Sequence, residues 1–198
     1  MRNQLKRISL KGFKTIRALQ DFNPGALTAL IGPNGAGKSN FISFFRMLAW
    51  TLAAPGNLQV HVGEQGGASA LLHDGPAKTR EIEAELTLTT DAGENQYAFR
   101  LVYAGGDTLI YADEQYRFSC WGTAPWLGQG AGHRESNLIV ASDVGDATAR
   151  VILGLLRKIV VYQFHNTSAT ARMRGKWDIE DNRWLKEDAG NIAPFLRR

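Results

Sequence analysis

The chain of 198 residues has one cysteine and four histidines, and it has no run of eighteen apolar residues. Cys120 cannot form an internal disulfide, which favours a reducing compartment such as the cytoplasm. The histidines show no spacing that would place two of them on one helical face as metal ligands: His61, His73, His133 and His165. No segment is long and apolar enough for a membrane span or a secretory signal. We therefore expect a soluble domain without disulfides or structural zinc.

Length and charge set the next bounds. A chain of this size buries roughly 70% of the surface that it exposes when unfolded, which suffices for a packed core in one domain. The net charge is +4, and its surplus lies at the ends: residues 1–17 hold six bases and no acid, and residues 150–198 hold ten bases and five acids. This distribution is compatible with binding of a polyanion such as a nucleotide or a nucleic acid. It is equally typical of the solvent-exposed faces of an ordinary domain.

Apolar spacing in the first third predicts a strand, a glycine-rich turn and a helix. Leu5 to Phe13 forms a first apolar segment, and Ala26 to Ile31 a second, tighter one. From Ser39 the apolar residues recur at three- and four-residue steps until Pro55-Gly56 stops the pattern. Residues 56–78 are rich in glycine and polar residues, and we expect a surface loop there.

The remaining two thirds predict a meander followed by a return to the core. Residues 81–121 contain alternating segments separated by turns, which is typical of an antiparallel meander whose acids face water. Residues 144–156 have helical spacing, and 159–164 predict a buried strand. A further helix is expected to begin near Asp188. Cys120, at the end of the meander, is expected to be a small core residue.

One motif points to chemistry. The pattern G-x-x-x-x-G-K-[ST] is matched at every fixed position, between a predicted strand and a predicted helix, by the string Gly32-Pro33-Asn34-Gly35-Ala36-Gly37-Lys38-Ser39. The glycines permit backbone angles and close approach that a Cβ would forbid, so successive N–H groups can point at phosphate oxygens. Lys38, the predicted catalytic residue, can reach the β and γ phosphates, and the Ser39 hydroxyl can coordinate Mg²⁺. The sequence therefore predicts a site for Mg·ATP.

The longer string GPNGAGKSN, which adds Asn40, resembles the P-loop of ABC-type ATPase heads in RecF, SMC and related bacterial AAA-family ATPases. The opening LKRISLKGFKTI is similar to the first strand and turn of such heads. The segments VYQFHNTS and DAGNIAPFL, with Asp181-Asn182 between them, are similar to a run shared by RecF-like ATPases. The resemblance covers nearly the whole chain.

This resemblance implies an α/β P-loop NTPase fold, lobe I of an ABC-type head with an antiparallel β subdomain. The core would comprise residues 1–55 and 140–198, and the inserted subdomain about 79–121. Nucleotide would be bound by the nine residues of the motif, which are Gly32, Pro33, Asn34, Gly35, Ala36, Gly37, Lys38, Ser39 and Asn40. Gln163 would be the counterpart of the glutamine that approaches Mg²⁺ and the attacking water, or else a plain polar residue at the end of a strand.

Two motifs of such heads have no counterpart here. No run of four apolar residues ends in Asp-Glu, the arrangement in which Asp secures Mg²⁺ and Glu polarises water; the nearest approach, Leu109 to Glu114, is expected to be an exposed strand end. No LSGGQ-like signature is present. In the family both motifs come from the C-terminal half, so we expect this chain to be an N-terminal portion that is inactive alone.

Two functions of different classes follow. The first is an ATPase head that pairs with a second copy around two nucleotides and couples ATP to DNA maintenance or anti-phage defence. The alternative is a nucleotide-gated module that binds ATP without turnover and controls a partner such as a nuclease or toxin. A transporter domain is a weaker match, because such domains have a shorter stretch than the one from Ser39 to Gln163.

Overall fold

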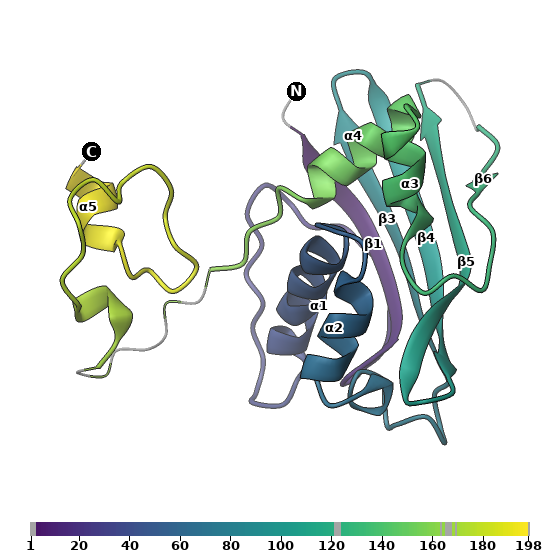
Figure 1. Cartoon of the computed structure of the whole chain (residues 1–198), viewed down its shortest axis with the longest axis horizontal. Helices are drawn as coiled ribbons and strands as arrows, with labels where there is room; N and C mark the ends of the chain where they lie inside the picture. The colour runs from purple at the N-terminus through teal and green to yellow at the C-terminus, as the bar shows by residue number, and fades with distance from the viewer. Residues whose placement is uncertain (1–2, 121–123, 163, 165–167, 169, 198) are drawn as a thin grey trace. The chain divides into compact units, whose positions relative to one another are not determined.

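The computed structural model describes residues 3–120, 124–162, 164, 168 and 170–197, which fall into two compact units, 1–159 and 160–198 (Figure 1). The helices and strands of the first unit are β1 (Gln4–Phe13), β2 (Ile16–Phe22), α1 (Lys38–Thr51), α2 (Asn57–Glu64), the 3-10 turn η1 (Ala68–Ala70), β3 (Glu81–Thr90), β4 (Gly93–Ala104), β5 (Thr108–Ser119), β6 (Leu127–Gly128), α3 (Asn137–Asp143) and α4 (Ala147–Leu156). The second unit contains η2 (Arg172–Arg174) and α5 (Ile192–Arg197). The chain is thus a mixture of helix and sheet, as predicted.

One six-stranded antiparallel sheet organises the first unit, in the order β2-β1-β3-β4-β5-β6. The predicted meander is confirmed as β3, β4 and β5. β1 pairs with β3, with Leu10 opposite Ala84. The N-terminal hairpin and the meander are therefore parts of the same sheet.

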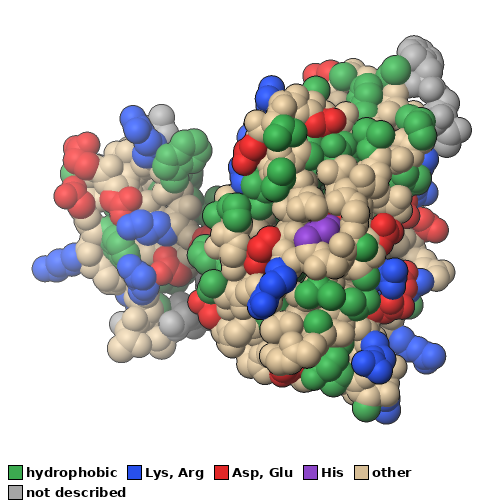
Figure 2. All heavy atoms as spheres, turned by 45° about the vertical axis from the view of Figure 1, so that its right-hand side comes forward, with side chains coloured by type: hydrophobic (Ala, Val, Ile, Leu, Met, Phe, Trp, Pro, Cys, Tyr) green, Lys and Arg blue, Asp and Glu red, His purple; other side chains and the backbone are tan. Residues whose placement is uncertain are grey.

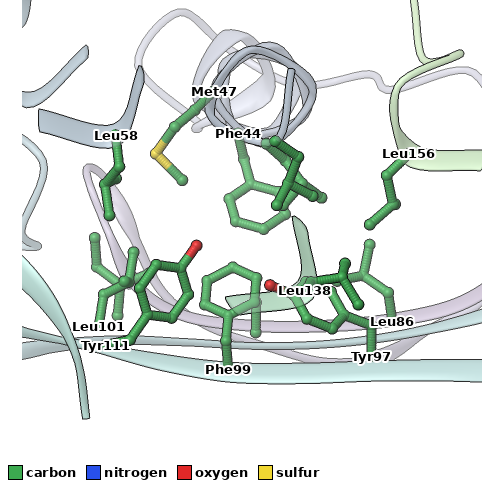
Figure 3. Close-up of a cluster of buried hydrophobic side chains, with 14 of the residues drawn as sticks. Phe44, Met47, Leu58, Leu86, Tyr97, Phe99, Leu101, Tyr111, Leu138 and Leu156 are labelled. Carbon is green, nitrogen blue, oxygen red and sulfur yellow. The ribbon is translucent and has the colours of Figure 1, made fainter. Parts of the chain in front are cut away.

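The helices α1 to α4 cover one face of this sheet (Figure 1). Side chains from α1, including Phe44 and Met47, lie over Phe99 and Leu101 of β4 in the core (Figure 3). Along β3 the inward residues are buried and alternate with Glu81, Glu83 and Glu85, which are half-exposed, as the alternation predicted. Each fully buried large apolar side chain stabilises the fold by roughly 1.5–3 kcal/mol.

The strands predicted at 26–31 and 159–164 are wrong in this structure. Leu27 is 93% and Ile31 94% exposed, and neither segment belongs to a strand among the described residues. Val160 is also half-exposed, at 51%. A short apolar run marks a segment that can be buried in a sheet, but pairing requires neighbouring backbone donors and acceptors. The strands that the structure describes are all engaged in the antiparallel sheet, and none pairs with these segments.

The surface loop predicted at 56–78 is also wrong, because this stretch contains α2 and η1. Leu58 and Val62 lie one turn apart and are buried in the core. The carboxylate of Glu135 accepts hydrogen bonds from the N–H groups of Leu58 (3.1 Å) and Gln59 (3.3 Å). An acid far away in the sequence thus accepts hydrogen bonds from the free N–H groups in the first turn of α2. Burial of its apolar face then stabilises a short helix that its own residues would not stabilise in isolation.

The prediction that Leu109 to Glu114 forms an exposed strand end is wrong for Glu114, because its side chain is fully buried. The pairing of β4 with β5 shifts between Arg100 and Leu101, which leaves Ala112 as an extra residue on β5. Such a bulge resets the alternation of side chains, so that Tyr111 and Glu114 both face the helices. Cys120, expected in the core, is exposed just beyond the end of β5.

The second unit is a short folded segment held by polar contacts. The buried Asn191 donates from Nδ2 to the carbonyls of Asp181 (2.7 Å) and Trp184 (2.8 Å), and its Oδ1 accepts from Lys186 N (2.8 Å). The ammonium of Lys186 lies 4.2 Å from the ring centroid of Trp177. The helix predicted at the end of the chain is confirmed as α5.

Candidate nucleotide-binding site

The motif loop, residues 32–39, runs directly into α1. Gly35 and Gly37 have φ values of +84° and +86°, in the left-handed region that favours glycine. Gly37 immediately precedes the helix, and its carbonyl accepts the first helical hydrogen bond from Phe41 N (2.8 Å). The two glycines therefore allow the chain to reverse sharply before α1 begins.

The start of α1 is suited to bind an anion. Gly37 supplies no side-chain hydrogen bond to cap the helix, and no acid lies in the first turn. The first N–H groups of a helix have no partner within it and carry about half a positive charge in sum. Because α1 is fourteen residues long, its full dipole is available to a phosphate at this end.

Lys38 closes the loop. Its Nζ donates hydrogen bonds to the carbonyl oxygens of Gly32 (2.6 Å) and Pro33 (2.7 Å). Ala36 N donates to the carbonyl of Pro33 (3.3 Å), which makes the tip of the loop a turn. A charged phosphate oxygen would accept a stronger hydrogen bond from the ammonium than these neutral carbonyls do. The lysine is thus held over the loop by contacts that a triphosphate can replace.

The other predicted residues occupy the rest of the same turn. Asn34 and Ser39 are exposed, and Ser39 lies in the first turn of α1. Asn40 points instead to the turn between β1 and β2, where its Nδ2 donates to Thr15 Oγ1 (2.8 Å). Gln163, the predicted counterpart near Mg²⁺, lies outside the described residues.

Two grooves meet at Lys38. The first has a volume of about 620 Å³ and is lined by Asn3, Gln4, Leu5, Phe22, Pro24, Gly25, Ala26, Thr28, Leu30, Lys38, Ser39, Phe41, Ile42 and Phe45. The second has a volume of about 490 Å³ and is lined by Thr15, Ile16, Arg17, Ala18, Leu19, Phe22, Ala29, Leu30, Ile31, Ala36, Gly37, Lys38 and Phe41. Both are large enough for part of a small-molecule ligand and are mainly apolar. Neither lining set, within the described chain, contains Asp or Glu.

The hydroxyl of Ser39 fits one position on Mg²⁺, which prefers oxygen ligands. The part of the chain that the structure describes holds no group of three His, Cys, Asp or Glu residues that could bind a metal ion by itself. Of the described groove residues, Ser39 could therefore supply one oxygen ligand to a magnesium ion, next to phosphate oxygens and water. Sites in which Mg²⁺ accompanies a nucleotide commonly add one or two carboxylates to such ligands.

Surface charge is mixed rather than uniformly basic. Figure 2 shows Lys and Arg side chains interspersed with Asp and Glu on the visible face of the larger unit. Two bases of the N-terminal segment are themselves paired with acids: Lys11 pairs with Glu83 (3.0 Å), and Arg7 lies 3.6 Å from Asp21. Exposed pairs of this kind contribute little stability, but they reduce the positive field of the segment. Among the residues with described structure, no helix is both long and apolar enough to cross a membrane.

The turn formed by Lys14 and Thr15, which resembles the opening turn of ABC-type ATPase heads, contacts the motif loop, and the sequence did not predict this contact. Partial burial lowers the pKa of Lys14 from its ordinary value. Its Nζ donates to Gln65 Oε1 (2.9 Å), outside both grooves. The turn reaches the motif loop through Thr15, which contacts Asn40. The only sequence signal for this contact was the position of the turn within the similar opening segment.

Residues 27–113 match a family model described as "AAA domain, putative AbiEii toxin, Type IV TA system". The match includes the motif loop and α1 and ends at residue 113, in the first half of β5.

The chain is also similar to curated bacterial proteins named chromosome partition protein Smc. It is 34% identical to that of Mycolicibacterium paratuberculosis over 94 residues, which are 46% of this chain and 7% of that protein. The same values hold for the protein of Mycobacterium tuberculosis. Identity to that of Mycobacterium leprae is 44% over 54 residues, 26% of this chain and 4% of that protein. The chain thus matches less than a tenth of the length of these relatives.

Proposed function

We propose that the chain is an AAA-type P-loop protein similar to SMC- and RecF-like ATPase heads, and that it binds Mg·ATP at residues 32–40. The match of residues 27–113 to an AAA domain model and the similarity to Smc proteins support this proposal. The observation that carries the proposal is the conformation of the loop itself. Two left-handed glycines precede an uncapped helix, and Lys38 lies across the loop on neutral carbonyls. These groups supply donors and positive charge where a triphosphate would lie.

Hydrolysis requires more than this loop. In-line attack of water on the γ phosphate needs a group that positions the water, and Mg²⁺ in such sites is usually bound by a carboxylate as well as by the loop hydroxyl. The residues that line the two grooves include no carboxylate. We therefore propose that the acid comes from outside the described residues, on a strand that pairs with the exposed segment 26–31 or from a partner.

Replacement of Lys38 tests nucleotide binding. The Lys38→Ala variant should bind Mg·ATP at least about 100-fold more weakly, because one charged contact to two phosphates is lost. Isothermal titration calorimetry measures the dissociation constant. Lys78→Ala is the matched control, since Lys78 is an exposed lysine paired with Asp74 (3.3 Å) on the surface. Undiminished affinity of the Lys38 variant would contradict the assignment.

A second candidate function is a nucleotide-gated module that binds ATP without hydrolysing it. The lack of a carboxylate in the groove linings favours this role for the chain by itself. A phosphate-release assay distinguishes the two functions. Turnover that depends on Lys38 would support an ATPase, and intact binding without phosphate release would support the module.

We propose further that ATP binding is coupled to DNA maintenance or to anti-phage defence, through pairing of two copies around two nucleotides in the cytoplasm. The similarity to proteins named for chromosome partition supports a role in DNA maintenance. The matched family, whose description names a putative toxin, supports a role in defence. A gel shift at increasing salt tests DNA binding, because phosphate contacts weaken steeply as salt is added. Sedimentation with and without ATP tests the pairing, and co-purification with a nuclease or toxin tests the remaining partner class.

A further inference from the structure

We infer that Thr15 is a positioning residue for the phosphate-binding loop, an inference that rests on the proposed binding of ATP. Thr15 lies in the turn between β1 and β2, and its Oγ1 accepts a hydrogen bond from Asn40 Nδ2 (2.8 Å). The same oxygen lies 3.1 Å from the position that a Cβ on Gly37 would occupy. Thr15 thus contacts the loop at its last glycine and at the first turn of α1.

The turn that carries Thr15 is held on several sides. Lys14 N donates to the carbonyl of Leu71 (2.8 Å), and Gly12 accepts from His73 N (2.9 Å). Gly12 has φ +72°, and a Cβ there would lie 2.1 Å from the carbonyl oxygen of Glu81. The backbone on the N-terminal side of Thr15 is therefore held by hydrogen bonds to residues 71–73 and packs closely against Glu81.

Aromatic packing connects the same turn to α1. Phe13 is fully buried, and its ring meets that of Phe44 edge to face at 5.6 Å. Phe44 is one turn of helix beyond Asn40, so the polar contact at Thr15 and the aromatic contact at Phe13 bind the same end of α1. The hairpin turn and the start of the helix therefore form one rigid support.

The other end of the loop is held by the ammonium of Lys38, which a phosphate would draw away from Gly32 and Pro33, and the segment before the loop is exposed. Leu27 and Ile31 are more than nine-tenths exposed. The conformation of the loop is thus set mainly from the Gly37 end, where Thr15 lies. Loss of its acceptor oxygen would free the Asn40 amide and loosen the N–H groups of Lys38 and Ser39. ATP would then have to order these N–H groups when it binds, and the entropy lost in this ordering would lower the affinity.

The test compares variants of the full chain by calorimetric titration with magnesium and a non-hydrolysable ATP analogue. Thr15→Val keeps the shape and removes the acceptor, and it should raise the dissociation constant about five- to tenfold. Thr15→Ser keeps the hydroxyl and should bind like the parent. Thr108→Val is the matched control at the turn between β4 and β5, where Thr108 Oγ1 donates to Gly105 O (3.1 Å).

Thermal unfolding separates positioning from general stability. Thr15 is exposed, so Thr15→Val should change the melting temperature no more than Thr108→Val does. Asn40→Ala should weaken binding by at least a similar factor, because Asn40 also belongs to the proposed binding loop. Thr15→Val should cause no further loss when it is added to Asn40→Ala.

Parent-like affinity of Thr15→Val, failure of Thr15→Ser to restore binding, or additive effects of Thr15→Val and Asn40→Ala would each overturn the inference. A parent chain that binds no nucleotide would instead overturn the proposed function.

Discussion

At the scale of single residues, the fully buried carboxylate of Glu114 is held by hydrogen bonds from several neighbouring elements. It accepts hydrogen bonds from Tyr97 OH (2.6 Å), from Asn137 N at the start of α3 (2.8 Å) and from the hydroxyl of Ser136. Burial above all, with the nearby Tyr111 and Glu114, raises the pKa of Tyr97 well above its ordinary value. The phenol therefore stays protonated and remains a donor. These contacts join β4, β5 and α3.

Glu114→Gln should lower the free energy of unfolding by roughly 2–4 kcal/mol, because an amide replaces one acceptor oxygen by a donor that faces other donors. Urea denaturation monitored by circular dichroism measures the change. The neighbouring Asp113→Asn is the control: Asp113 lines a groove on the opposite face of the sheet, and its variant should change the free energy by less than about 0.5 kcal/mol. Equal effects of the two substitutions would contradict the role of Glu114.

At the scale of elements, segments of similar apolarity have opposite environments. β3 contains Leu86, which is fully buried between paired strands. The segment 26–31 contains Leu27, which is 93% exposed. Only β3 has neighbours on both sides to satisfy its backbone groups and cover its side chains. The contribution of an apolar strand to stability therefore depends on the available partners as well as on its composition.

The same substitution in the two segments tests this difference. Leu27→Ser should change the free energy of unfolding by less than about 0.5 kcal/mol, since its side chain is already in water. Leu86→Ser should lower it by more than about 3 kcal/mol, because a cavity and an unpartnered hydroxyl are created in the core. Chemical denaturation measures both. A large loss at Leu27 would show that the segment is buried in solution.

At the scale of the whole molecule, His61 on α2 connects stability to pH. Burial lowers the pKa of His61 from 6.5, the nearby Lys14 lowers it further, and Glu64 partly offsets both. The unfolded chain therefore binds a proton at a higher pH than the folded chain. The stability that the neutral histidine contributes is complete above pH 6.5, and it is lost as the pH falls from 6.5 through the lowered folded value.

We expect the urea midpoint of the parent chain to fall between pH 7.5 and pH 5.5 by more than that of His61→Gln, which cannot take up this proton. Denaturation series at the two pH values measure the difference. The remaining decrease, common to both chains, belongs to other titrating groups. Identical decreases in the two chains would show that His61 does not contribute.

The sequence predicted the turn and the helix start of the candidate site better than the complete fold, and nucleotide binding at this loop stays a prediction. A contiguous motif specifies its own geometry, since the glycines, Lys38 and Ser39 act over eight residues and one helix start. The meander was predictable because alternation and turn residues are local signals. The helix α2 was not, because Glu135 and the core stabilise it from a distance. Glu114 was misplaced because a bulge one residue long reverses the alternation.

The amino-acid sequence by itself determined the loop that suits a phosphate, the strands of the meander and the start of α1, because each depends on neighbours within a few positions along the chain. Tertiary structure alone decided that the N-terminal hairpin joins the meander in one sheet and that Thr15 meets Asn40. It also decided that segment 26–31 pairs with no strand of the part of the chain that the structure describes. These outcomes depend on which distant backbone and side-chain groups come within hydrogen-bonding distance. Local periodicity carries no information about that choice.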